Sequence, residues 1–282
     1  MTREKACILV VDAYAKEGRD DLVAGGAHAA GDLYAQMLER LGRGRVACEI
    51  HYPAEDGLNL PGGRALTDYD GVAWTGSSLT IYHDDDRVTP QIELARRAYD
   101  AGIPQFGSCW AVHVAVIAAG GRVAAHPEGR EMGVARKLAL TPAGRGHPIY
   151  DAKPGVFDGF ISHDDEVTHL PANGLCLAVG RYSEVQAVSV RRGPGTFWAV
   201  QYHPEYDLRE MARLMYCRMG KLIRRGFFAD EEAALAHIDK LDQLHAHPGR
   251  ADLAWQLGLD ADVLDRDVRE LEVKAWLDHK IL

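Results

Sequence analysis

The sequence has few cysteines, and their spacing gives no sign of a disulfide framework or a zinc site. The five are odd in number and include no Cys-x-x-Cys pair: Cys7, Cys48, Cys109, Cys176 and Cys217. Disulfide-bonded small domains and structural zinc sites both need cysteines in close, paired spacing. We therefore predict a protein with reduced thiols, located in the cytoplasm.

Long apolar runs and an excess of positive charge are also lacking. No run approaches the roughly 20 apolar residues that cross a bilayer, and the start of the chain, MTREKACILVVDAY, lacks the apolar core and cleavage site of a signal peptide. The 41 acidic residues outnumber the 32 basic ones, which gives a net charge of -9. Nucleic-acid-binding proteins normally present a basic face. We expect neither a membrane nor a nucleic acid as a partner.

The first half of the chain alternates between strand and helix patterns. Short, continuous apolar runs predict strands, and apolar residues at helical spacing predict helices. The predicted strands are 6–14, 45–53, 70–76 and 103–107, and the predicted helices are 27–42, 90–102 and one that starts near Trp110. Short connections between such elements imply a parallel sheet with helices on both faces.

The second half changes in character twice. Several strand-like runs follow in close succession between about residues 122 and 200 and predict an antiparallel extension. A helix is predicted over 207–226, and only helical patterns follow from 230 onward. The predicted fold class is α/β: an open, mostly parallel twisted sheet with helices on both faces, a small antiparallel extension and a C-terminal helical appendage. We divide the 282 residues into a main domain, 1–228, and the appendage, 229–282.

One cysteine lies where a predicted strand meets a predicted helix. In FGSCWAVHVAV (106–116), Cys109 follows Gly-Ser and precedes the helical pattern. A free cysteine in an apolar neighbourhood is most often a small buried residue. A helix N-terminus, however, stabilises the thiolate, which is the nucleophilic form. The backbone N–H of Trp110 would then face an oxyanion formed at the thiolate's target. From this stretch alone, both interpretations are open.

A second stretch offers the base that a cysteine nucleophile needs. QYHPE (201–205) follows an apolar run and contains His203 and Glu205. In an extended segment, a spacing of two places both side chains on one side. His203 would take the thiol proton, and Glu205 would orient the imidazole through its other nitrogen. A turn with solvated polar ends explains HPE equally well when it is considered alone.

Two loops complete the candidate residues. WTGSS (74–78) ends a predicted strand, so the N–H of Gly76 or Ser77 could serve as a second oxyanion donor, although an ordinary loop fits as well. FISHDD (160–165) contains His163 and Asp164, to which chemistry alone assigns no role.

Together, these stretches resemble the class I glutamine amidotransferase family, and above all the glutaminase domain of GMP synthetase. GSCWA corresponds to the family's G-x-C-x-G, QYHPE keeps its H-P-E, and GSSLTIY is similar to its oxyanion loop. SHDDEVTHLP and GREMG are similar to two further family segments. The likeness covers roughly residues 6–206 in the family's order.

The resemblance implies a catalytic triad and a reaction. Its nucleophile would be Cys109, its base His203 and its orienting carboxylate Glu205. The remaining implied oxyanion and substrate-binding residues are Gly76, Ser77, Trp110, His113, His163 and Asp164. Glutamine or a γ-glutamyl amide would be cleaved through a glutamyl thioester, without a metal or an organic cofactor.

Two residues depart from the family pattern. Ala111 stands where the family has a glycine, and its methyl group could crowd the strand-to-helix turn. His113 replaces a glutamine that helps to hold the glutamine substrate. Histidine is shorter, and its ring can carry a charge. Both changes leave the triad intact and bear on the substrate.

Three functions are open at this stage. The first is a glutaminase subunit that passes ammonia to a partner synthetase, because the chain has no GxxxxGK[ST] P-loop and no room for a synthetase domain. The second is a hydrolase of γ-glutamyl amides or peptides that needs no partner, with a pocket reshaped by His113. The third is a non-enzymatic scaffold, against which the intact triad argues. The C-terminal helices could cover a homodimer face or pack on their own domain.

Overall fold

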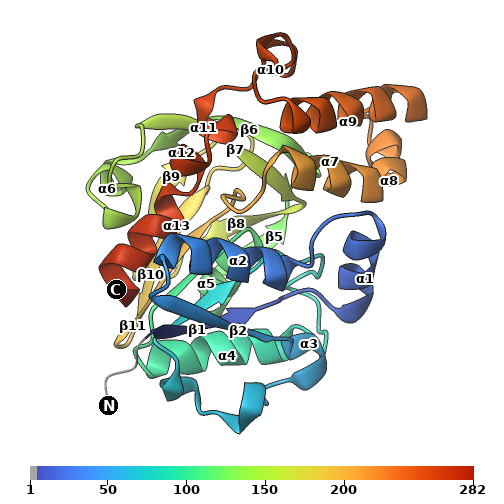
Figure 1. Ribbon diagram of the computed structural model, residues 1–282. Coiled ribbons are helices and arrows are strands. Elements are labelled where there is room, and N and C mark those ends of the chain that lie inside the picture. Colours follow the sequence, from blue (N-terminus) through green and yellow to red (C-terminus); the bar gives the residue numbers. More distant parts are fainter. Residues whose placement is uncertain (1–4) are drawn as a thin grey trace.

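The computed structural model describes residues 5–282 and has a nine-stranded sheet at its centre (Figure 1). In sheet order, the strands are β2 (Val46–His51), β1 (Ala6–Val11), β3 (Gly71–Trp74), β4 (Gln105–Ser108), β11 (Gly195–Val200), β10 (Ala187–Arg192), β9 (Gly174–Val179), β6 (Glu131–Leu140) and β7 (Val156–His163). Neighbours from β2 to β11 are parallel, and neighbours from β11 to β7 are antiparallel. The predicted α/β class, with its antiparallel extension, is confirmed.

The inner parallel strands are buried on both faces, whereas the edge strand β2 is mostly partly buried. In β1, Leu9 and Val11 belong to one apolar core, whereas Ile8 and Val10 belong to the other. Successive side chains of a strand point to opposite faces, so a strand covered on both sides needs a continuous apolar run. That is why the run ILVV predicts this strand correctly.

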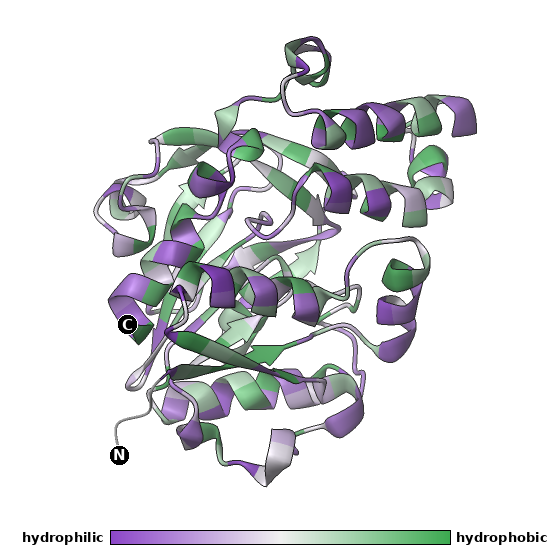
Figure 2. Ribbon diagram, viewed as in Figure 1, coloured by the Kyte–Doolittle hydropathy of each residue, from purple (hydrophilic) through white to green (hydrophobic). Residues whose placement is uncertain are grey.

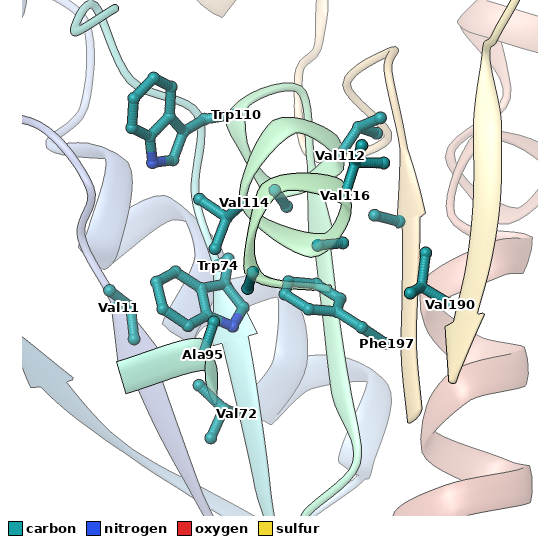
Figure 3. Packing of buried hydrophobic residues seen from close by; sticks show 14 of the residues in the cluster. Val11, Val72, Trp74, Ala95, Trp110, Val112, Val114, Val116, Val190 and Phe197 are labelled. Carbon is teal, nitrogen blue, oxygen red and sulfur yellow. The ribbon is translucent and has the colours of Figure 1, made fainter. Parts of the chain in front are cut away.

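Helices cover the two faces of the sheet. Residues of α4 (Thr89–Asp100) and α5 (Trp110–Ala118) build the first core, and residues of α2 (Ala30–Gly42) and α13 (Leu271–Trp276) build the second. Figure 3 shows side chains of α5 packed among those of the strands, with Trp74 and Phe197 close to it. The rings of Trp74 and Phe197 stack with their centroids 5.9 Å apart. α5, and with it the residue that precedes it, is therefore fixed on the sheet.

A small second sheet lies next to the end of β7. It pairs β5 (Arg122–Ala125) with β8 (Asp165–His169) in antiparallel fashion. Asp164 is the single residue between β7 and β8. The remaining short elements are α3 (Pro53–Asp56), α6 (Pro142–Arg145) and the 3-10 turns Pro61–Gly63, Leu66–Asp68 and Pro148–Tyr150.

The C-terminal helices divide into two groups. α9 (Glu231–Ala246) packs along α7 (Leu208–Cys217), and α10 (Ala251–Leu257) stands away from the body of the molecule, with Trp255 88% exposed (Figure 1). Figure 2 shows alternating hydrophilic and hydrophobic bands along α9, as expected for a helix with one buried face. After α11 (Ala261–Leu264) and α12 (Arg266–Arg269), the chain returns to the sheet.

The last helix, α13, belongs to the interior of the sheet domain. Trp276 is fully buried and stacks on Phe106 of β4, with ring centroids 5.6 Å apart. Glu272, also fully buried, accepts hydrogen bonds from the Lys153 ammonium and the Tyr202 hydroxyl. The division of the chain at residue 228 stays a prediction.

Three segments differ from the sequence-based prediction. Helix α1 (Lys16–Ala24) was not predicted, because Leu22 is its only buried residue and its pattern is hardly amphipathic. The predicted helix 207–226 is interrupted at Arg218, which separates α7 from α8 (Met219–Arg224). The last stretch with a helical pattern, DVRELEVKAWLDHKIL (267–282), is divided among α12, α13 and a π turn, Leu277–Ile281.

No helix within residues 5–282 is both long and apolar enough to cross a membrane. Residues 1–4, part of the segment on which the prediction about a signal peptide rests, lie outside the described residues.

Candidate active site

Cys109 occupies a strained corner between β4 and α5. Its backbone has φ 54° and ψ -98°, a conformation that L-residues rarely adopt. The Cys109 N–H donates to the carbonyl of Val200 at 2.7 Å, which holds the corner against β11. The side chain is 5% exposed, and its Sγ lies 3.6 Å from the Ser162 carbonyl oxygen. Such strain is retained mainly where a side chain has to be presented at a functional site.

The turn accommodates Ala111 because Gly107 has no side chain. A Cβ atom added at Gly107 would lie 2.5 Å from the Cβ of Ala111 and 2.5 Å from the carbonyl oxygen of Trp74. The close approach of strand and helix therefore depends on a glycine before the cysteine. The methyl group of Ala111 is fully buried at this crossing.

His203 and Glu205 follow β11, which is the neighbour of β4. The His203 Nδ1 and the Glu205 Oε1 are 2.7 Å apart, and both side chains are almost completely buried. Ser108 donates to the same Glu205 oxygen at 2.8 Å, and the Tyr34 hydroxyl donates to Ser108 at 3.0 Å. The Tyr206 ring stacks on the imidazole with a centroid distance of 4.0 Å. The orientation of the base is thus fixed from two sides.

The charge on Glu205 decides the protonation of His203. Burial by itself would lower the pKa of His203, but Glu205 and, to a smaller extent, Cys109 raise that pKa to about 9. The Cys109 thiol raises this pKa both by a charge interaction and as a hydrogen-bonding neighbour, although the Nε2 atom has no hydrogen bond of ordinary geometry within residues 5–282. An imidazolium beside a thiol is the arrangement that stabilises a thiolate.

The loop after β3 lies next to both Cys109 and His203. A Cβ atom added at Gly76 would be 3.2 Å from the His203 Cε1 and 3.8 Å from the Cys109 Cβ. The Ser77 hydroxyl donates to the Ala13 carbonyl and so anchors the loop. The N–H groups of Gly76, Ser77 and Trp110 have no acceptor in the described part of the chain. The loop and the first turn of α5 therefore offer free donors near the Cys109 sulfur.

A cavity of about 100 Å³ opens beside Cys109. His113 lines it from α5, and neither of its ring nitrogens has a hydrogen-bond partner of ordinary geometry within residues 5–282. Burial, helped by the neighbouring His163, lowers the pKa of His113 to about 3. His113 is consequently neutral near pH 7, so the charge that sequence reasoning allowed for it is absent there.

His163 and Asp164 line the same cavity, but their polar atoms are already engaged. The His163 ring bonds to the Asp165 carbonyl at 2.8 Å and to the Glu131 carboxylate at 3.0 Å. Asp164 accepts from the guanidinium groups of Arg130 and Arg225. Six of the nine sequence-predicted residues line this cavity: Ser77, Cys109, Trp110, His113, His163 and Asp164. Gly76 lies next to Cys109 and His203, and Glu205 is bonded to His203, but none of these three lines the cavity.

Four residues of the site escaped sequence reasoning. Ser108 and Tyr34 extend the hydrogen-bond chain behind Glu205, and Arg130 and Arg218 line the cavity. Ser108 stands next to Cys109 in GSCW, and Arg130 lies in GREMG, so both were in view without a chemical reason to choose them. No local pattern marks Tyr34 or Arg218.

Residues 32–218 match the sequence model of the glutamine amidotransferase class-I family. This match spans well over half of the chain. The chain belongs to that family. It is an enzyme of the class I glutamine amidotransferase type, as the arrangement of residues in the sequence suggested.

Relatives within the family differ in the share of their own length that matches this chain. A γ-glutamyl-L-1-hydroxyisopropylamide hydrolase from a Pseudomonas species is 32% identical over 99% of this chain and 94% of its own length. A GMP synthase from a Nitratiruptor species is 30% identical over 76% of this chain, but over only 40% of that protein. The crystal structure of a glutamine amidotransferase from Thermotoga maritima superposes with a TM-score of 0.64 at 14% identity, covering 98% and 97% of the two chains. The last likeness concerns the fold alone.

Proposed function

We propose that this protein hydrolyses γ-glutamyl amides without a partner subunit, using Cys109 as nucleophile. The observation that carries the proposal is the full-length similarity to a γ-glutamyl-L-1-hydroxyisopropylamide hydrolase, which extends over 99% of the chain and includes its C-terminal helices. The position of Cys109 at the mouth of a small polar cavity supports it. Substrates are γ-glutamyl derivatives of small amines.

The proposed reaction has two steps. In the first, the Cys109 thiolate attacks the δ-carbonyl carbon, and the N–H groups of Trp110 and of the Gly76–Ser77 loop stabilise the oxyanion. Protonated His203 then gives its proton to the amine nitrogen as the C–N bond breaks, which leaves a glutamyl thioester. In the second step, water loses a proton to His203, attacks the thioester and releases glutamate and the thiolate. Glu205 keeps the imidazole oriented throughout.

A glutaminase subunit that feeds a synthetase is the second candidate. The similarity to GMP synthase favours it, but that match covers 40% of GMP synthase, whereas the hydrolase match covers 94% of the hydrolase. The family glutamine that helps to hold the substrate is His113 here, a neutral ring whose nitrogens make no hydrogen bond of ordinary geometry within residues 5–282. Both facts favour a γ-glutamyl amide over free glutamine. A partner synthetase is not part of this proposal, and a homodimer stays a prediction.

The cellular compartment is part of the same proposal. All five cysteines are free, as expected for a reducing environment. We place the protein in the cytoplasm on this ground.

The test measures ethylamine release by the purified protein. The substrates are γ-L-glutamyl ethylamide, α-L-glutamyl ethylamide and, with ammonia release as the readout, L-glutamine. We expect the first to be cleaved fastest, and Cys109→Ala to abolish cleavage while the circular dichroism spectrum and the melting temperature are retained. If the wild-type protein cleaved γ-L-glutamyl ethylamide no faster than the Cys109→Ala variant, the proposal would be excluded. If L-glutamine were the best substrate, the second candidate would be favoured.

A further inference from the structure

Arg218 lies at the point where the helix predicted over 207–226 is interrupted. Its backbone, with φ -103° and ψ 7°, ends α7, and α8 begins at the next residue. The side chain is half-buried and lines the cavity beside Cys109. Its guanidinium donates to the Ser162 hydroxyl at 2.8 Å. The interruption thus coincides with a cation that faces the cavity.

Arg218 differs from the other arginines near the cavity in its ion pairs. Arg130 pairs with Asp164, and Arg225 pairs with the other oxygen of the same carboxylate. Arg218 has no carboxylate partner within residues 5–282. The acidic groups that act on the Arg218 charge are the hydroxyls of Tyr14 and Tyr206 and, after them, the Cys109 thiol. Burial raises the pKa of each tyrosine, so both hydroxyls are neutral near pH 7. A partly buried guanidinium without an anion is costly unless a ligand supplies one.

The neighbouring Arg130 strengthens this imbalance. Its side chain is only 7% exposed, it also donates to the Ser162 hydroxyl, at 2.6 Å, and its Nε atom has no partner among the described residues. Two guanidinium groups therefore converge on one neutral hydroxyl. A carboxylate beside them would relieve their mutual repulsion and accept charge-assisted hydrogen bonds.

The distance from the nucleophile suits a γ-glutamyl group. Ser162 contacts the Cys109 sulfur through its carbonyl oxygen at 3.6 Å and the two arginines through its hydroxyl. In an extended γ-glutamyl group, four bonds separate the δ-carbonyl carbon from the α-carboxylate carbon, a span of about 5 Å. Ser162 of β7 thus lies between the Cys109 sulfur and the Arg218 guanidinium, and a γ-glutamyl group is long enough to reach from one to the other.

We infer that Arg218, assisted by Arg130, binds the α-carboxylate of the γ-glutamyl substrate and restricts the enzyme to amides that carry a free α-carboxylate. This inference rests on the proposed function and specifies its substrate class. Arg218 acts in binding and is not a proton-transfer group. A different role, stabilisation of the Cys109 thiolate by the Arg218 charge, makes the opposite prediction for substrates without the carboxylate.

The test compares the wild type and the Arg218→Met variant on two substrates that differ by one group. γ-L-Glutamyl ethylamide is compared with N-ethyl-4-aminobutanamide, which lacks only the α-carboxylate. We expect Arg218→Met to lower kcat/KM for the first by about 10- to 100-fold, mainly through KM, as for a lost charge-assisted contact. For N-ethyl-4-aminobutanamide, the wild type and the variant should agree within about two-fold, because the partner group is already missing. Equal losses on both substrates would overturn the inference.

Two controls separate binding from other effects. Arg213→Met removes one positive charge from α7, where Arg213 pairs with Asp242 away from the cavity, and it should match the wild type on both substrates. Arg218→Lys should recover part of the lost affinity for γ-L-glutamyl ethylamide. The pH profile of Cys109 alkylation by iodoacetamide should be unchanged in Arg218→Met, and an upward shift of that profile would assign Arg218 to the thiolate instead.

A binding measurement keeps this inference distinct from the proposed function. Calorimetry on Cys109→Ala needs no turnover and compares L-glutamine with 4-aminobutanamide. We expect L-glutamine alone to bind, and the additional substitution Arg218→Met to abolish its binding. This result would uphold the inference even if no γ-glutamyl amide were hydrolysed. Equal binding of L-glutamine with and without Arg218 would refute it, whatever the activity.

Discussion

The two sides of the cavity differ in how completely their polar groups are satisfied. On the side formed by the parallel strands, Tyr34, Ser108, Glu205 and His203 form a continuous hydrogen-bond chain that ends at the imidazole beside Cys109. On the side formed by the antiparallel strands and the α7–α8 break, Arg218 has no carboxylate partner within residues 5–282. Under the proposed function, the polar groups of the first side are complete without a ligand, whereas the substrate carboxylate completes those of the second. Catalysis and substrate recognition would then belong to different parts of the sheet.

The largest expected effect comes from a substitution in the hydrogen-bond chain that contains Glu205 and His203. Glu205→Gln keeps the shape of the side chain but removes the charge that holds the His203 proton. We expect kcat for γ-L-glutamyl ethylamide to fall by at least about 100-fold. The pKa of His203, now about 9, should drop toward its ordinary value, because Glu205 raises it. Steady-state kinetics and an NMR titration of the imidazole measure the two effects.

A matched substitution controls for the loss of one carboxylate. Glu232→Gln makes the same chemical change on the exposed surface of α9 and should leave kcat unchanged. If the Glu205→Gln variant were as active as the Glu232→Gln variant, the hydrogen bond between His203 and Glu205 would have no role in the reaction.

A smaller effect is expected from changing His113 on the cavity wall. His113→Gln supplies an amide donor and acceptor where the imidazole makes no ordinary hydrogen bond. We expect KM for L-glutamine to fall by about three- to ten-fold, with a smaller change for γ-L-glutamyl ethylamide. Ammonia and ethylamine release measure the ratio. A parallel change for both substrates would show that His113 does not discriminate between them.

The two buried histidines also predict opposite dependences of stability on pH. Folded His113 stays neutral down to about pH 3, but the unfolded chain takes up a proton near pH 6.5, so acidification below pH 6.5 favours unfolding. Folded His203 keeps its proton up to about pH 9, so its contribution is present below pH 6.5 and is lost as the pH rises toward 9.

Urea unfolding at several pH values tests this contrast. Between pH 6.5 and 4.5, His113→Gln should lose less free energy of unfolding than the wild type, by up to about 1.4 kcal/mol per pH unit. Identical slopes for the two proteins would mean that His113 is protonated in the folded state.

The smallest effect is expected where strand and helix cross. Ala111→Gly restores the family residue in α5 and should lower the free energy of unfolding by about 1 kcal/mol, because glycine is the poorer helix former. Turnover should stay within about two-fold of the wild type. Gly107→Ala, at the facing position of β4, should lower the free energy of unfolding several times more, since the added Cβ would lie 2.5 Å from the Trp74 carbonyl oxygen. A large loss of activity in Ala111→Gly would show that the methyl group positions Cys109.

The contrast between the two sides also marks what the sequence could predict. β1 and β3 carry continuous apolar runs, and Cys109, His203 and Glu205 belong to short motifs with a chemical reason for each residue. Arg218 has neither kind of signal, because its role depends on a helix break that local periodicity does not encode. Tyr34 reaches Ser108 across 74 residues, a proximity that only the packing of α2 on the sheet creates. Residue types thus suggest the proposed reaction, whereas the residues proposed to select the substrate are brought together only by long-range packing.

The position of α13 has a consequence for the synthesis of the protein. Trp276 covers Phe106 of β4, and Val273, Trp276 and Leu277 share an apolar core with Ile8 and Val10 of β1. Because translation runs from the N-terminus to the C-terminus, the part of this face that α13 covers, beside the part covered by α2, stays exposed until these residues have left the ribosome. The nascent chain therefore exposes apolar surface through most of its elongation, which is the condition under which chaperones engage a protein.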